Sequence, residues 1–264
     1  MSISILFSLS YTLQECINLA EISALLNQIK LEKILFLDIE TVSAKETLEE
    51  LSETMQELWS NKAAQRYADE DKTASELYRR AAIYAEFGRV VCISCGYFQT
   101  KDNERILKIK SFAGDDEKQI LEEFSSMLSG YYNGKEHRLC AHNGKEFDYP
   151  YLGRRMLING VKLPDILNTP GKKPWEVNHL DTLELWKFGD YKNYTSIKLL
   201  TSIFNIPTPK DDIDGSMIYD VYYKEKNLER IVTYCQKDVM AVARLYLKFN
   251  GEDIFDDDQV SIQT

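Results

Sequence analysis

Apolar and polar residues follow one another in patterns that predict regular elements along most of the chain. Residues 33–37 contain a short apolar run that ends in acidic residues, which is typical of a fully buried strand. Residues 45–86 carry apolar side chains at helical spacing, and this predicts helices inserted after the first strand. Residues 89–98 and 104–112 then predict two strands, and the polar turn at 100–103 joins them into a hairpin.

The second half of the chain predicts mainly helices, with one further strand. The predicted elements are a helix that starts at 115–117, a strand at 138–141, a helix at 149–158, a loop at 161–178, renewed order at 179–182, and helices at 196–204 and 228–249. This order predicts an α/β fold with a mixed sheet flanked by helices. Three early strands are mostly antiparallel, and a helical crossover leads to the next strand. Such an arrangement suits a ribonuclease H-like core.

Length and composition indicate one large globular domain. The 264 residues are 44% hydrophobic and 28% charged, which is ordinary for a soluble protein. We expect an N-terminal extension over residues 1–30, the folded domain over 31–250, and a solvated acidic tail over 251–264. No apolar run approaches the roughly 20 residues of a membrane span, the N-terminus lacks the basic region of a secretory signal, and the five cysteines are scattered. These features favour a cytoplasmic protein with reduced thiols, and no zinc or redox role is expected for Cys92 and Cys95.

The net charge of −10 argues against broad electrostatic binding to a nucleic-acid duplex. It does not exclude an enzyme that acts on nucleic acid, because a short single-stranded substrate needs only a local basic track. Part of the negative charge also comes from acidic residues that are candidates for a functional site.

Four carboxylates stand at three separated places in the chain, each on or beside a predicted element. Asp38 and Glu40 are two apart on a strand, so their side chains project from the same face. Asp148 stands at the start of a helix, where free N–H groups stabilise negative charge. Tyr234 and Asp238 are four apart on a helix and share a face as well.

Carboxylates that converge on one point repel one another unless cations hold them together. Two Mg²⁺ or Mn²⁺ ions would cancel four negative charges, and these metals prefer hard oxygen ligands. The chain has only three histidines, so a zinc site is less favoured. Two such ions in one site are suited to in-line phosphoryl displacement.

The three motifs resemble those of the DEDD 3′–5′ exonucleases, in the branch that carries a tyrosine (DEDDy). The match is best with predicted exonucleases related to the proofreading domain of family B DNA polymerases, and it covers about residues 32–249. The motifs are Asp38-Ile39-Glu40-Thr41, Asn143-x-x-x-Phe147-Asp148 and Tyr234-x-x-x-Asp238. The sister branch has histidine where this chain has Thr233, which favours the tyrosine branch.

The resemblance implies a metal-dependent enzyme that releases nucleoside 5′-monophosphates from the 3′ end of single-stranded DNA or RNA. By the same resemblance, Asp38, Glu40 and Asp238 bind the metal that activates water. Asp38 also bridges to a second metal that Asp148 reaches, and Tyr234 orients the attacking water.

Three further residues are candidates for substrate binding. Thr41 and Asn143 are candidates for holding the terminal nucleotide. Phe147 either stacks on a base or belongs to the core.

Other interpretations stay open at this level. The same fold could serve as a non-catalytic module that binds nucleic acid, or as a related metal-dependent endonuclease. Asp181 and Asp214 resemble motif residues but are also suited to capping helices or turns. His142 is more typical of a structural histidine than of a metal ligand. The sequence does not distinguish DNA from RNA and indicates no protein partner.

Overall fold

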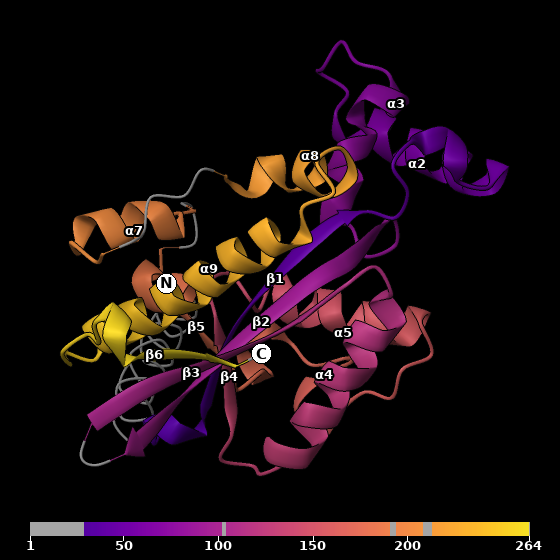
Figure 1. The fold of residues 1–264 in the computed structure, drawn as a ribbon. Helices are drawn as coiled ribbons and strands as arrows, with labels where there is room; N and C mark the ends of the chain where they lie inside the picture. The colour runs from indigo at the N-terminus through magenta and orange to yellow at the C-terminus, as the bar shows by residue number, and fades with distance from the viewer. Residues whose placement is uncertain (1–28, 102–103, 191–193, 208–212, 264) are drawn as a thin grey trace, which may run out of the picture.

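The computed structural model describes residues 29–101, 104–190, 194–207 and 213–263, and it is an α/β fold built on one mixed sheet (Figure 1). The six strands lie in the order β5-β4-β1-β2-β3-β6. Strands β1, β2 and β3 pair antiparallel, whereas β4 pairs parallel with β1, β5 with β4, and β6 with β3. The strands are β1 (Ile34–Ser43), β2 (Gly88–Lys101), β3 (Glu104–Ala113), β4 (Arg138–Ala141), β5 (Leu180–Asp181) and β6 (Val260–Gln263). The predicted α/β class, early antiparallel strands and helical crossover are confirmed.

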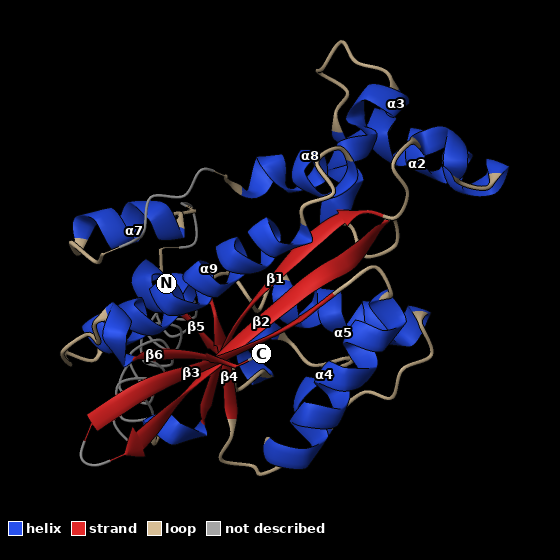
Figure 2. Ribbon diagram, in the orientation of Figure 1, coloured by secondary structure: helices blue, strands red, loops and turns tan. Residues whose placement is uncertain are grey.

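Helices cover both faces of the sheet (Figure 2). On one face α4 (Glu117–Tyr131) and α5 (Asp148–Ile158) pack on the odd-numbered residues Leu35, Leu37 and Ile39 of β1. On the other face α9 (Leu228–Phe249) packs on the even-numbered residues Ile34 and Phe36. Because side chains alternate along a strand, Asp38 and Glu40 continue the face that meets α9.

The predicted helical insertion follows β1 and extends away from the sheet (Figure 1). It contains α2 (Glu53–Arg66) and α3 (Ala74–Leu77), which pack around the buried Trp59 in a small hydrophobic cluster of their own. The remaining helices are α6 (Thr182–Lys187), α7 (Ile197–Ile203) and α8 (Ile218–Tyr223). Within the described ranges, no helix combines the length and the apolar character needed to cross a bilayer.

Strand β1 is longer than the apolar run that predicted it. It continues to Ser43 because β2 pairs with it throughout, with Thr41 opposite Val90 and Ser43 opposite Gly88. The pairing with β4 on the other side reaches only Phe36. The two acidic residues therefore lie within β1 instead of at its end, and they lie beyond the last residue that pairs with β4.

The acidic C-terminal segment differs from the solvated tail that its composition predicts. Phe255 is buried in the hydrophobic core, and β6 adds to the edge of the sheet beside β3. Asp257 pairs with the buried guanidinium of Arg244 on α9, at 2.6 Å between Nη2 and Oδ1. The charged residues face solvent while the apolar ones between them pack, so residues 251–263 belong to the folded domain. Of the predicted N-terminal extension, residues 1–28 lie outside the described residues.

The four described cysteines are free thiols and are all buried. Cys92 and Cys95 belong to different hydrophobic clusters, on opposite faces of the sheet, as their spacing in a strand predicts.

A buried ion pair holds α5 against α4 and the start of β2. The Arg155 guanidinium donates from Nε to Glu117 Oε1 at 2.8 Å and from Nη1 to the backbone oxygen of Ala85 at 2.8 Å. Glu117 also accepts the backbone N–H of Val90 at 2.7 Å. Since Asp148 is the first residue of α5, this network sets the position of one candidate site carboxylate.

Replacing Arg155 with methionine should destabilise the protein by about 3–5 kcal/mol, because the buried Glu117 carboxylate loses its cation. Urea unfolding followed by circular dichroism measures the change. The neighbouring Arg154 is exposed, so Arg154→Met should stay within about 0.5 kcal/mol of the wild type. Equal stability of both variants would show that the Arg155 pair does not hold α5.

Candidate active site

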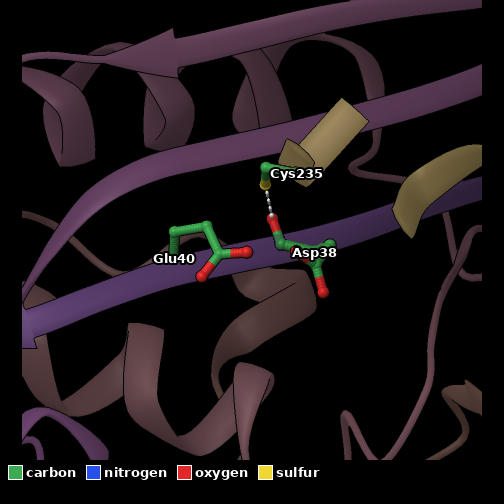
Figure 3. A group of neighbouring side chains, drawn as sticks. All are labelled: Asp38, Glu40 and Cys235. Atoms are coloured by element: carbon green, nitrogen blue, oxygen red, sulfur yellow. Dashed lines mark hydrogen bonds between the residues drawn. The ribbon is translucent and has the colours of Figure 1, made fainter. Parts of the chain in front are cut away.

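Asp38 and Glu40 on β1 come together with Cys235 on α9 (Figure 3). One carboxylate oxygen from each acid and the Cys235 Sγ atom all lie within 4.8 Å of one another. The Cys235 thiol donates a hydrogen bond to the backbone oxygen of Asp38, at 3.3 Å. Together with the apolar packing of α9 on the sheet, this contact sets the position of α9 against β1. Because Tyr234 and Asp238 lie one residue before and three residues after Cys235, it also places both of them beside the two acids.

Asp148 reaches the same site from the N-terminus of α5. Its side chain is only 4% exposed, and its carboxylate accepts hydrogen bonds from its own backbone N–H and from that of Ile39. Burial raises the pKa of Asp148 to about 8, the two backbone hydrogen bonds oppose the rise, and the charges of Asp181 and Asp238 add to it. The carboxylate thus lies beside β1 just past the point where pairing with β4 ends.

The charges of Asp238 and Asp148 act on both acidic residues of β1. Burial raises the pKa of Asp38 well above its usual value, and the charges of Asp238, Glu40 and Asp148 raise it further. The pKa of Glu40 is raised by burial first and then by Asp238, with smaller effects of Cys92 and Asp148. The structure therefore brings the four carboxylates near one another, and the closest group among the described residues, within 4.8 Å, consists of Asp38, Glu40 and Cys235.

Tyr234 adds a neutral hydrogen-bond donor to this cluster. Burial raises the pKa of its phenol, and the neighbouring charges of Asp238, Glu40 and Asp38 raise it further. A hydrogen bond to the Asp238 carboxylate has the same effect. The hydroxyl consequently stays protonated at neutral pH, and it is suited to orienting a group rather than to taking up a proton.

Asp181 organises the loop that leads to Asp148. Its carboxylate accepts the backbone N–H of Asn143 at 2.9 Å and that of Lys145 at 3.0 Å. It also caps the N-terminus of α6 through Leu183 N at 2.9 Å. Asn143 adopts a left-handed backbone conformation with φ of 65°. Gly144 is packed so closely that a Cβ atom there would lie 2.5 Å from the Cβ atom of Ala141, so a larger residue does not fit.

Asp181 and Asp214 both act as caps, which is one of the two interpretations that the sequence left open for them. Asp214 accepts the backbone N–H of Ser216 at 2.8 Å at the start of a short 3₁₀ helix. His142 is a structural histidine, as expected, because Nδ1 pairs with the Thr182 hydroxyl and Nε2 donates to the backbone oxygen of Thr195, both at 2.9 Å.

The three candidate substrate residues have different surroundings. The Thr41 hydroxyl lies near the Tyr151 phenol, where it opposes the rise in the pKa of Tyr151 that burial causes. Phe147 is half-buried against the core beneath α4 and α5, and its ring centroid lies 5.3 Å from that of Tyr151. Asn143 lies half-buried at the start of the Asp148 loop. The sequence did not lead us to expect the contact of Cys235 with β1. The position of Cys235 between Tyr234 and Asp238 does indicate that it lies near the site.

The site has the properties of a centre for hard divalent cations. The Asp38 Oδ2 atom is buried and has no hydrogen-bond partner, which is costly for a charged oxygen unless a cation binds it. The other donors nearby are carboxylate oxygens, the ligands that Mg²⁺ and Mn²⁺ prefer. Burial raises the pKa of the Cys235 thiol well above its usual value, so that group stays protonated beside the oxygen donors.

Comparison with known proteins agrees with this geometry. Residues 82–259 match the family described as predicted 3′–5′ exonucleases related to the exonuclease domain of PolB. The chain belongs to this family. The matched segment includes Asp148, Tyr234 and Asp238, whereas Asp38 and Glu40 precede it on β1. No curated protein matches the chain.

The raised pKa of Asp38 predicts how stability changes with pH in metal-free protein. A carboxyl whose pKa is raised by folding contributes stability below its unfolded pKa of about 3.9, and this contribution is lost as pH rises through the folded pKa. With a chelator present, the free energy of unfolding of Asp38→Asn should therefore exceed that of the wild type by about 1–3 kcal/mol at pH 8, and by less at pH 5.

Urea unfolding at the two pH values measures this difference, and Asp71→Asn, at an exposed position, is the matched control. Added Mn²⁺ should stabilise the wild type more than Asp38→Asn. A stability difference that does not change between pH 5 and pH 8 would contradict the role of carboxylate repulsion.

Proposed function

We propose that the protein is a metal-dependent 3′–5′ exonuclease that hydrolyses the terminal phosphodiester bond of single-stranded DNA or RNA. The observation that carries the proposal is the convergence of Asp38, Glu40, Asp148 and Asp238 with Tyr234 in one largely buried site. Membership in a family of predicted 3′–5′ exonucleases supports the direction of attack.

The four carboxylates would hold two ions of Mg²⁺ or Mn²⁺. Asp38, Glu40 and Asp238 would be ligands of one ion, and Asp38 and Asp148 would be ligands of the other. Bound in this way, such ions lower the pKa of water and stabilise the charge that develops on the attacking and leaving oxygens. Asp38 is suited to the shared position because its buried Oδ2 atom has no hydrogen-bond partner in the protein.

The reaction consumes one water for each nucleotide removed. The water oxygen forms a bond to the phosphorus of the terminal nucleotide, and the bond from that phosphorus to the preceding 3′ oxygen breaks. The 3′ oxygen takes up a proton, so the products are a nucleoside 5′-monophosphate and a strand shortened by one residue. Tyr234, kept protonated by its surroundings, would hold the attacking water in line.

The first test is hydrolysis of a 5′-labelled single strand, in DNA and in RNA, with Mg²⁺ or Mn²⁺. The wild type should shorten the strand from its 3′ end and release nucleoside 5′-monophosphates. Asp38→Asn combined with Glu40→Gln removes two ligand charges and should lower the rate at least about 100-fold. Asp69→Asn combined with Asp71→Asn makes the same kind of change at two exposed positions and should leave the rate unaltered.

Blocked and circular substrates separate this proposal from its alternatives. A strand with a blocked 3′ end and a circular single strand should both stay intact. Cleavage of the circle would identify an endonuclease instead. Tight binding of the open strand without metal-dependent turnover would identify a binding module and end the proposal.

A second test removes only the hydroxyl of Tyr234. Tyr234→Phe keeps the ring and loses the hydrogen bond to Asp238. The attacking water would then be held less well in line, while the carboxylates that bind the metal stay in place. We expect kcat to fall by about 10- to 100-fold with little change in KM. Steady-state kinetics on a short single strand measures both, and an unchanged kcat would exclude a role for the hydroxyl.

A further inference from the structure

An exposed aromatic side chain, Tyr194, lies at the rim of the carboxylate site. It stands just before α7, and its side chain is 68% exposed. Its ring centroid lies 6.2 Å from that of His142, and the two rings meet edge to face at 68°. Exposure alone does not distinguish this ring, because Tyr131, Trp175 and Phe188 are exposed to a similar degree, but its contact with His142 places it beside the loop that carries Asp148.

The partner of this ring is held rigidly. His142 pairs with the Thr182 hydroxyl and with the backbone oxygen of Thr195, which directly follows Tyr194. His142 also directly precedes Asn143, whose backbone N–H is bound by Asp181. Tyr194 is thus anchored to the same loop that carries Asp148, although it is far from Asp148 in sequence.

The charges of the site reach the Tyr194 phenol. Partial burial raises its pKa, and the charges of Asp148 and Asp181 raise it further, followed by those of Asp238 and Asp38. The phenol is therefore neutral at neutral pH, so it adds no negative charge at the rim. The exposed ring remains available for contact with a ligand that enters the site.

We propose that Tyr194 stacks on the base of the 3′-terminal nucleotide and so positions the scissile phosphate over the carboxylates. This inference rests on the exonuclease function proposed above. An aromatic face accepts any base, which suits an enzyme that removes successive nucleotides without regard to sequence. Phe147, the stacking candidate suggested by the sequence, packs against the core and against Tyr151, whereas the ring of Tyr194 faces solvent.

The test is binding of a single-stranded oligonucleotide that carries 2-aminopurine at its 3′ end and a phosphorothioate at its last linkage, which keeps the strand intact in Mg²⁺. Stacking quenches 2-aminopurine, so the wild type should quench it strongly. Tyr194→Leu should lose the quenching and raise Kd about 10-fold or more. Tyr194→Phe keeps the ring and should behave like the wild type.

Tyr131 provides a matched control, because it is 76% exposed and lies at the end of α4, before the start of β4. His142, the partner of Tyr194, follows the other end of β4. Tyr131→Leu should change neither quenching nor Kd. On a cleavable strand, Tyr194→Leu should raise KM much more than it lowers kcat.

An oligonucleotide with an abasic 3′-terminal residue completes the test. It should weaken binding by the wild type to the level of Tyr194→Leu, and it should not weaken Tyr194→Leu further. Wild-type quenching and affinity in Tyr194→Leu would overturn the stacking proposal while leaving the exonuclease proposal intact. Failure of the wild type to bind or shorten single strands would overturn both.

Discussion

Electrostatic repulsion among four largely buried carboxylates is the constraint on which this architecture depends. Asp38 and Glu40 have strongly raised pKa values, and the pKa of Asp148 is raised to about 8. The fold opposes this repulsion with contacts on every side of the site. Cys235 binds α9 to β1, the Arg155 network holds α5, and Asp181 holds the loop between β4 and α5. These contacts hold the elements that carry the carboxylates in place independently of the repulsion among the carboxylates.

Unequal strand lengths create the space in which the site forms. β1 continues to Ser43 along β2, but β4 leaves it after Phe36. A strand without a neighbour exposes backbone N–H groups that need other acceptors. The Asp148 carboxylate accepts the N–H of Ile39, so the start of α5 takes the place of the missing strand residues. The third carboxylate therefore lies beside the first two at the point where the parallel pairing ends.

Local spacing in the sequence predicted the parts of the site that depend on one element. Two residues along a strand place Asp38 and Glu40 on one face, and four along a helix do the same for Tyr234 and Asp238. Features that depend on pairing between distant segments were not predicted in the same way. The length of β1 depends on its pairing with β2. The formation of β6 depends on its pairing with the edge of β3, and the position of the Tyr194 ring depends on its contact with His142. None of these leaves a periodic signal in its own segment.

Burial favours the neutral form of every ionisable group in the site, but bound cations would change the outcome only for the carboxylates. For the Tyr234 phenol and the Cys235 thiol it preserves the neutral form, so both remain hydrogen-bond donors at neutral pH. For the carboxylates it penalises the charged form only while cations are absent, because bound divalent ions stabilise ionised oxygens. Under the proposed function, the bound ions would keep the carboxylates ionised and would supply the positive charge that attracts a negatively charged strand. Metal binding would then precede productive substrate binding, since the charge that attracts the phosphate would come from the metal.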